Sequence, residues 1–289
     1  MQTKSKQVYL GCLYMFLGIF MFGLGNVLIK KINLEVPVIQ TLFVRAFLSG
    51  VGLAAYFYLF GKKELFKTHN RALQIVRGII GFFSLYSLYL SFDLLPLTDA
   101  TAISFATPLF ITALSFLVLK EKVTTPLWVA VCIGFIGVSI MAEPTGHVTL
   151  LGAGVAIFSA FFESLVMLFS RLLSRKDAPL TSVFYHATVI AIIAGCLTPF
   201  FWVPVSFSTM LLLILFSLIS CLGQIFVVYA YSTAPAVALA PIIYTLMIWG
   251  ALFGWFVWGE SLSHNLLIGM PIVILTGLYI VRKESQKTL

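Results

Sequence analysis

Residues 93–122 read DLLPLTDATAISFATPLFITALSFLVLKEK, and this stretch decides the fold class. It opens with two acids, Asp93 and Asp99, continues through about twenty apolar or small residues, and ends at the charged cluster 120–122. An α-helix needs this length to cross a hydrocarbon core about 30 Å thick. The stretch therefore predicts a transmembrane helix.

One side of this predicted helix carries polar groups. Hydroxylated residues and one proline recur at roughly helical spacing, at Thr101, Ser104, Pro108, Thr112 and Ser115. Such a stripe in lipid indicates a helix that faces a cavity or other helices. The stripe alone leaves open the alternative that Ser and Thr only allow close helix packing.

A second stretch, residues 234–260, repeats the same design. It reads APAVALAPIIYTLMIWGALFGWFVWGE, starts with small residues, carries Pro241 early and ends on Glu260. Glu121 corresponds to Glu260 at an offset of 139 residues, and Lys30 corresponds to Arg171 at an offset of 141. An offset of about half the chain indicates a duplicated unit. We expect two halves, residues 1–145 and 146–289.

The composition predicts an integral membrane protein. Of the 289 residues, 61% are hydrophobic and only 10% are charged, and the mean hydropathy is +1.06, whereas a soluble domain has about 25% charged residues. The net charge of +8 would suggest nucleic acid in a soluble protein. Here the basic residues fall in loops, where they fix orientation, so we expect the lipid bilayer and no nucleic acid as a partner.

Enzyme chemistry is not expected. The four cysteines fall inside apolar spans without paired spacing, which is typical of small apolar residues rather than disulfides or metal ligands. The four histidines have no metal-ligand spacing, and no phosphate-binding glycine loop is present. We therefore expect no metal, no cofactor and no direct drive by ATP.

Ten apolar spans can be placed along the chain. The run after Lys4 and Lys6 has no small-residue cleavage site, so it predicts a first transmembrane helix and not a removed signal peptide. The spans are approximately 8–29, 38–60, 72–92, 99–119, 126–142, 150–171, 181–202, 209–231, 236–258 and 265–281.

The distribution of basic residues predicts the orientation of these spans. With a cytoplasmic N-terminus, fourteen of the 18 Lys and Arg residues fall in cytoplasmic segments and two fall in outer loops. This bias favours both termini inside the cytoplasmic membrane. Five spans per half is an odd number, so the two halves would lie in opposite orientations. Inverted repeats of this kind are typical of secondary transporters that alternate access around a midplane site.

Three charged residues lie within the predicted spans. Arg45 and Glu163 are near the middle of theirs, and Arg77 is in the first turns of the third span. A charge at a helix centre costs about 2.5–3.5 kcal/mol, so each should face protein or water. One hypothesis is that they contact the substrate or a coupled proton. The alternatives are a structural ion pair and, for Arg77, extension of the side chain to the interface.

Amide, hydroxyl and aromatic groups supply further binding candidates. Asn26, Ser104, Gln224, Tyr244 and Trp249 suit a pocket for an organic ligand, which is mostly apolar with a few placed polar groups. In the eighth span, Ser217, Cys221, Gln224, Val228 and Tyr231 are expected on one face.

Other residues have plainer interpretations. Tyr86 and Tyr89 near the end of the third span are expected in the interfacial aromatic belt. His186 is expected to be held by a hydrogen bond, although a histidine there could titrate near neutral pH. Pro108 and Pro241 are the expected bending points for gating, because proline removes a backbone hydrogen bond.

Several motifs resemble those of the EamA-type branch of the drug/metabolite transporter superfamily. They are FVRAFLSG (43–50), RGIIGF (77–82), LPLTDATAISFATPLF (95–110) with a glutamate closing the fourth span, and APIIY (240–244) with WGE (258–260) closing the ninth. The resemblance covers essentially the whole chain. RGIIGF with LTDATAISFATPLF is most similar to the bacterial S-adenosylmethionine transporter group, and Lys120 stands where the family often has glycine.

The resemblance implies an all-α fold of ten transmembrane helices, with a central cavity between the halves and the fifth and tenth helices at the periphery. It implies a secondary transporter of a small organic metabolite by alternating access, with S-adenosylmethionine or a similar cationic or zwitterionic compound as the expected substrate. Amino acids and riboflavin-like compounds are the alternatives. A non-transporting membrane protein, such as a lipid-handling enzyme, is the second class. A homodimer is left open.

Overall fold

The computed structural model describes residues 2–118, 125–141, 149–174, 176–233, 239, 242–243, 245–259 and 264–288. All regular structure in these residues is helical. The α-helices are α1 (Gln2–Ile32), α2 (Val38–Leu59), α3 (Arg71–Leu94), α4 (Leu97–Ser104), α5 (Ala106–Val118), α6 (Thr125–Met141), α7 (Leu150–Leu173), α8 (Pro179–Leu197), α9 (Phe207–Thr233), α11 (Thr245–Trp258) and α12 (His264–Thr288). Two short 3-10 helices, η1 (Lys63–Phe66) and η2 (Thr198–Phe200), lie in the connections.

Six of these helices are long and apolar enough to cross a membrane. They correspond to Tyr9–Ile32, Val38–Leu59, Arg71–Leu94, Leu150–Leu173, Pro179–Phe200 and Phe207–Thr233. Four shorter apolar segments accompany them, within Leu97–Ile111, Trp128–Ile140, Ile248–Trp258 and Leu267–Thr276. Large apolar side chains on the outside, such as Phe200, Phe207 and Phe256, are at least 81% exposed. A soluble protein does not expose so much apolar surface, so the outer face is one that lipid covers. The protein is therefore a multi-pass membrane protein.

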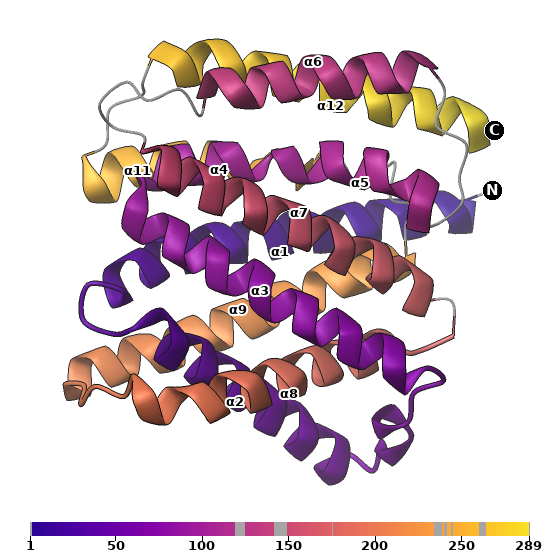
Figure 1. Ribbon diagram of the computed structural model, residues 1–289. Helices are drawn as coiled ribbons and strands as arrows, with labels where there is room; N and C mark the ends of the chain where they lie inside the picture. The colour runs from indigo at the N-terminus through magenta and orange to yellow at the C-terminus, as the bar shows by residue number, and fades with distance from the viewer. Residues whose placement is uncertain are drawn as a thin grey trace.

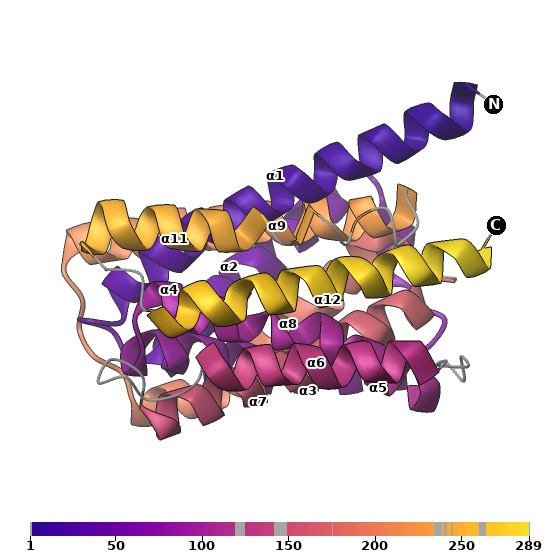
Figure 2. The same ribbon diagram turned by 90° about the horizontal axis from the view of Figure 1, so that it is seen from above.

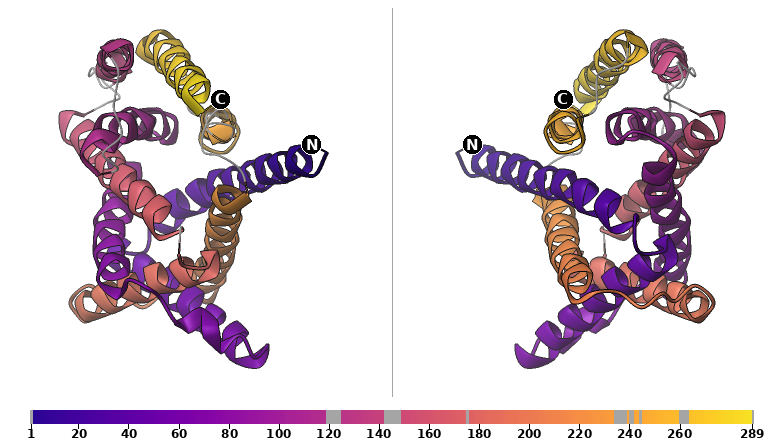
Figure 3. Two further views of the ribbon diagram at one scale, coloured as in Figure 1. Left: turned by 90° about the vertical axis from the view of Figure 1, so that its right-hand side faces the viewer. Right: turned by 90° about the vertical axis from the view of Figure 1, so that its left-hand side faces the viewer.

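The helices run roughly along one axis. Figure 1 places the start of α1 and the end of α12 at the same end of the bundle, together with η1 and the connection from α7 to α8. The view from above shows α1 reaching beyond the other helices at its N-terminal end (Figure 2). Seen end-on, α6 and α12 lie side by side at one edge of the bundle (Figure 3).

Helices from the two parts of the chain pair with each other rather than with their sequence neighbours. The closest pairs are α1 with α9, α3 with α7, α2 with α8, and α6 with α12. Glycines permit the approach of α3 to α8: a Cβ added to Gly78 would lie 2.5 Å from Cβ of Val189, and one added to Gly81 would lie 2.2 Å from Cε1 of His186. The two glycines of RGIIGF therefore let α8 pack directly against the backbone of α3.

The predicted helix 99–119 is divided in the structure. Helix α4 ends at Ser104 and α5 begins at Ala106. Pro108 has no N–H, so it cannot donate to the carbonyl of Ser104, and the hydroxyl of Thr107 donates to that carbonyl instead at 2.8 Å. The helix thus breaks at the residues whose backbone hydrogen bond Pro108 removes. Glu121, Pro241 and Glu260 lie outside the described residues.

A cluster around Asp177 closes one end of the bundle. Its carboxylate accepts hydrogen bonds from the Thr68 hydroxyl, from the His69 N–H at 2.8 Å and from the Gln74 amide at 2.9 Å. Burial raises the pKa of the Asp177 carboxyl, but these hydrogen bonds outweigh burial and hold the pKa below its usual value. The cluster joins the segment before α3 to the connection between α7 and α8.

A second cluster, around Glu35, closes the opposite end. The Thr209 hydroxyl donates to the Glu35 carboxylate. The Gln40 amide donates to the Val203 carbonyl and accepts from the Val203 N–H, both at 2.9 Å. This cluster joins the connection between α1 and α2 to the start of α9.

Candidate functional site

A cavity lies at the centre of the bundle. Its volume is about 170 Å³, and α1, α2, α3, α4, α5, α7, α8, α9 and α11 all contribute side chains to its wall. The wall is mostly apolar, with Phe22, Phe92, Phe105 and Phe216 among its aromatic groups. Hydroxyl, amide and charged groups occur at a few points, which is the usual character of a site for an organic ligand.

Glu163 on α7 is the carboxylate of the cavity. The Ser84 hydroxyl on α3 donates to Glu163 Oε2 at 2.9 Å. One helical turn away, the Ser159 hydroxyl donates to the Ser84 carbonyl at 3.0 Å. The small serines let α3 and α7 approach closely, and they fix the carboxylate from one side. The other side of Glu163 lies in the cavity wall.

Arg45 on α2 is the guanidinium of the cavity. Its carbon Cζ lies 5.9 Å from the centre of the Tyr89 ring, within the range of a cation–π contact. The Arg45 side chain is only 8% exposed, and its Nε has no hydrogen-bond partner among the described residues. A buried, unpaired donor of this kind is costly unless a ligand or water accepts from it.

His186 on α8 supplies a third polar group. It lines the cavity and lies against Gly81, and its Nδ1 is buried without a partner among the described residues. The expectation that a hydrogen bond holds His186 in place is therefore wrong for Nδ1. The absence of a side chain at Gly81 fixes the position of the ring instead.

Five of the sequence-predicted binding residues meet in this cavity: Asn26, Arg45, Ser104, Glu163 and Gln224. Arg77 and Trp249 do not line it. Arg77 is fully buried between α3, α7 and α8, where its Nε donates to the Ser170 hydroxyl at 2.7 Å and its Nη1 to the Ser182 carbonyl at 2.9 Å. It therefore does not extend to the interface.

Trp249 packs edge-on against Phe20 of α1, with ring centres 5.0 Å apart. Pro108 belongs to α5, although nothing of its side chain is described. Tyr244 and Pro241 lie outside the described residues.

Sequence reasoning missed several cavity residues. Tyr89 was expected in the interfacial belt, but it is only 4% exposed and faces the cavity. The signal that could have found it is the buried row Ser84, Ser87 and Ser91, which marks the protein-facing side of α3. The eighth-span face also divides: Gln224 and Tyr231 line the cavity, whereas Ser217 and Cys221 line a separate groove.

Comparisons with known proteins agree with this arrangement. The EamA-like transporter family matches residues 9–142 and again residues 150–282. The S-adenosylmethionine uptake transporter of Rickettsia prowazekii is 27% identical over 289 residues, covering 99% of this chain and 97% of that protein. The pseudopaline exporter CntI of Pseudomonas aeruginosa is 24% identical over 281 residues, covering 95% and 97%.

A solved crystal structure has the same fold, with a TM-score of 0.67 at 14% sequence identity over 96% of this chain and 98% of that chain. The family match decides between the two classes that the sequence left open. The chain belongs to the EamA-like transporter family and is a membrane transporter of small metabolites, not an enzyme.

Proposed function

We propose that the protein is a secondary transporter of the cytoplasmic membrane that moves a small zwitterionic metabolite by alternating access. The observation that carries this proposal is the meeting of Arg45 and Glu163, one from each half of the chain, on the wall of one central cavity. A site shared between two halves can open to either side when the halves rock against each other.

The cavity wall supports a duplicated unit. At the offset of 141 residues noted in the sequence, Phe22 corresponds to Glu163, Asn26 to Met167, and Arg45 to His186. All six of these side chains line the cavity. Equivalent positions thus serve the same place with different chemistry, as expected when a copied unit diverges around a shared site.

The helix pairing supports an inverted arrangement of the two units. If α1 corresponds to α7 and α3 to α9, then the pair α1–α9 exchanges with the pair α7–α3, and both pairs are in contact. The pairs α2–α8, α4–α11 and α6–α12 map onto themselves, as contacts across a two-fold axis must, and each of them also occurs.

The two end clusters fit the same exchange. Asp177 follows Glu35 by 142 residues, and Thr209 follows Thr68 by 141. Each acid accepts a hydrogen bond from the threonine of the other half, and the clusters close opposite ends of the bundle (Figure 1). We therefore propose ten transmembrane helices, five in residues 1–145 and five in 146–289, with the second set inverted.

The basic residues set the proposed orientation. The end of the bundle that carries both termini also carries Lys62, Lys63, Lys67 and Arg71 before α3. An excess of Lys and Arg marks the cytoplasmic side. We place both termini in the cytoplasm and the Glu35 cluster on the outer side.

The polar groups of the cavity favour a substrate with both signs of charge. Arg45 offers an unpaired donor to a carboxylate, and Glu163 offers a carboxylate oxygen to a cation. Aromatic side chains between them suit a planar ring. S-Adenosylmethionine has a sulfonium, an amino acid group and an adenine, and two relatives that span this chain bear that substrate in their names. Another relative is named as an exporter, so the direction of transport is tested rather than assigned.

The size of the cavity adds a requirement for movement. About 170 Å³ is below the roughly 300–1,000 Å³ of ligand pockets. Substrate entry therefore requires the helices that carry Arg45 and Glu163 to separate, which is the motion that alternating access supplies.

Reconstituted vesicles test the proposal. Vesicles containing the protein should take up labelled S-adenosylmethionine faster than empty vesicles, and unlabelled S-adenosylmethionine should compete better than methionine, other amino acids or riboflavin. Stronger competition by an amino acid or by riboflavin would assign the alternative substrate. Uptake equal to that of empty vesicles for every compound, in both orientations, would reject transport of this class.

A further inference from the structure

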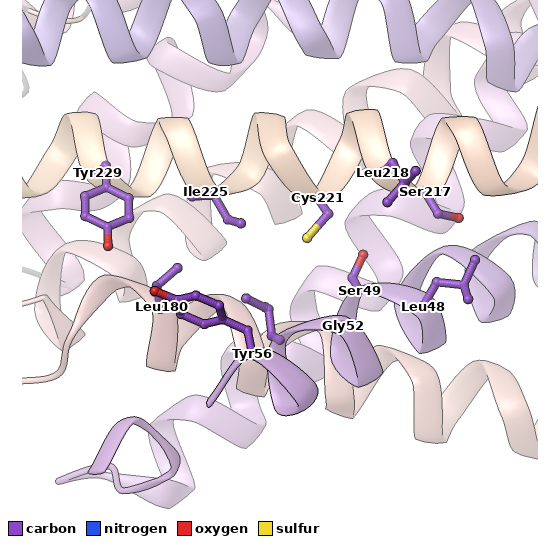
Figure 4. A pocket seen from close by; sticks show the side chains of 11 residues that line it. Leu48, Ser49, Gly52, Tyr56, Leu180, Ser217, Leu218, Cys221, Ile225 and Tyr229 are labelled. Carbon is purple, nitrogen blue, oxygen red and sulfur yellow. The ribbon is translucent and has the colours of Figure 1, made fainter. Parts of the chain in front are cut away.

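A second hollow lies away from the central cavity, on the lipid-facing side between α2 and α9. It is a groove of about 400 Å³, lined along α2 by Leu48, Gly52 and Tyr56 and along α9 by Leu218, Ile225 and Tyr229. Leu180 at the start of α8 also lines it. Figure 4 shows α9 above and α2 below, with the side chains of both turned into the space between them.

The dimensions of the groove fit one extended hydrocarbon chain. From Ser217 to Tyr229, α9 advances about 18 Å at 1.5 Å per residue. This is close to one leaflet of a hydrocarbon core about 30 Å thick. A transmembrane helix of that length, about 10 Å across, would occupy about 1,400 Å³. The groove is therefore too narrow for a helix of a second copy.

One end of the groove is polar and cationic. Lys62 Nζ donates to the Tyr56 hydroxyl at 2.9 Å and lies 5.2 Å from the centre of the Tyr56 ring. The Tyr229 hydroxyl, also in the lining, acts electrostatically on the same ammonium. The hydrogen bond to Tyr56 raises the pKa of Lys62, so this ammonium is charged at neutral pH.

The local backbone holds Lys62 at this place. Helix α2 ends at Leu59, and Gly61 adopts the left-handed region with φ of 66°, which glycine takes without strain. The Lys62 N–H then donates to the Phe57 carbonyl at 2.8 Å, a helix-terminating bond that folds the chain back over the last turn. The ammonium is thereby returned to the groove rather than carried away from it.

From this arrangement we propose that the groove between α2 and α9 binds one anionic phospholipid of the cytoplasmic leaflet, with an acyl chain along α9 and the phosphate at Lys62, Tyr56 and Tyr229. The assignment to that leaflet rests on the orientation under the proposed function. Acyl chains gain little by leaving lipid for an apolar groove, so the charge at the mouth must supply the selectivity. Anionic lipids are concentrated in the cytoplasmic leaflet, where basic residues near the surface attract them.

The chain offers matched controls for the charge. Lys63 is the neighbouring lysine, but its Nζ lies over the Tyr58 ring, which does not line the groove. Lys62→Gln and Lys63→Gln remove the same charge from adjacent positions. A surface effect would respond equally to both substitutions, whereas a groove site responds only to the first.

The chain also offers matched controls for the acyl chain. A Cβ added to Gly52 in the groove, or to Gly154 on α7, would meet nothing within 4 Å. Gly52→Leu fills the groove without a clash, and Gly154→Leu adds the same side chain elsewhere on the outer face.

The experiment measures binding of phosphatidylglycerol and of phosphatidylcholine with identical acyl chains to the purified protein by native mass spectrometry. We expect one phosphatidylglycerol bound in preference to phosphatidylcholine. Lys62→Gln should weaken binding about fivefold, as loss of one basic residue near the surface predicts, with Lys63→Gln within about twofold of the parent. Gly52→Leu should abolish the bound lipid, and Gly154→Leu should retain it.

Equal binding of the two lipids, equal effects of the two lysine variants, or full binding to Gly52→Leu would each overturn the proposal. So would conversion of a dimer to a monomer by Gly52→Leu, because a second copy would then be the occupant. If Gly52→Leu does not fold, the two lysine variants still decide. Transport does not enter the measurement, so its outcome is independent of the vesicle experiment.

Discussion

Replacing Glu163 by glutamine removes one negative charge from the cavity and changes little else. Glutamine has the same length, and its Oε1 can accept the hydrogen bond that the Ser84 hydroxyl now donates at 2.9 Å. The contact between α3 and α7 also keeps the bond from the Ser159 hydroxyl to the Ser84 carbonyl. We therefore expect the variant to fold and to reach the membrane in normal amounts.

The effect on transport follows from the loss of a buried ionic contact. Removing one partner of a buried, hydrogen-bonded charge pair costs about 2–5 kcal/mol, and about 2 kcal/mol corresponds to roughly 30-fold in binding. Uptake of a cationic or zwitterionic substrate at low concentration should fall by at least that factor. Ser84→Ala, which leaves the charge but removes its donor, should have a smaller effect of about 1 kcal/mol, or about fivefold.

The assay is initial uptake into vesicles at several substrate concentrations, with protein amount measured in the same vesicles. Glu64→Gln is the matched control, because Glu64 is exposed in η1 and away from the cavity. It should transport like the parent. Thermal stabilisation by substrate should be lost in Glu163→Gln and kept in Glu64→Gln. Uptake and stabilisation within about twofold of the parent in Glu163→Gln would show that the carboxylate does not contact substrate, and would refute the reasoning.

Three further predictions follow from the same geometry. Arg45→Gln should weaken a substrate with a carboxylate about tenfold, or about 1.4 kcal/mol, and leave its decarboxylated analogue unchanged in competition assays; equal losses for both would contradict the role of the guanidinium. Gly81→Ala should lower the melting temperature, because its Cβ would overlap His186 at a cost of about 1–3 kcal/mol, whereas Gly52→Ala, which meets nothing, should be neutral or stabilising; equal melting temperatures would contradict the close approach. Asp177→Asn should destabilise by about 2 kcal/mol at pH 7. Because the folded-state pKa of Asp177 lies below its unfolded value of about 3.9, this stabilisation is present above that pH and is lost as the pH falls through the folded pKa, so parent and variant should converge only in acid; convergence already at pH 6 would contradict the assignment.

The general architecture could be predicted from the sequence because hydropathy and loop charge act over whole helices. A run of about twenty apolar residues has few alternatives to crossing a bilayer. Buried charge is expensive enough there that Arg45 and Glu163 had to face protein or a cavity. Both residues line the central cavity, and the family match confirms the transporter class.

Finer features depended on packing that no single sequence displays. Tyr89 near the end of α3 is compatible with an interfacial position, and only the neighbouring helices turn it inward. Arg77 could not be separated from Arg45 by its type or by its place in a span. Its hydrogen bonds to Ser170 and to the Ser182 carbonyl come from residues about 100 positions away.

The division of one predicted helix into α4 and α5 was half visible in the sequence. Pro108 indicated a bend, but the break lies at Phe105, because proline removes a hydrogen bond from the preceding turn and not from its own position. The separate roles of Gln224 and Cys221 on α9 were not visible, since both positions fall within one broad polar face.

The most direct test of two inverted halves uses positions that the duplication makes equivalent. Leu34, beside the Glu35 cluster, and Lys176, beside the Asp177 cluster, are 142 residues apart and both exposed. Leu34→Cys and Lys176→Cys would be treated in intact cells with a maleimide that cannot cross the membrane, with the parent chain as the blank. The inverted arrangement predicts labelling of Leu34→Cys in intact cells, and labelling of Lys176→Cys only after the membrane is opened. Labelling of both from the same side would contradict it.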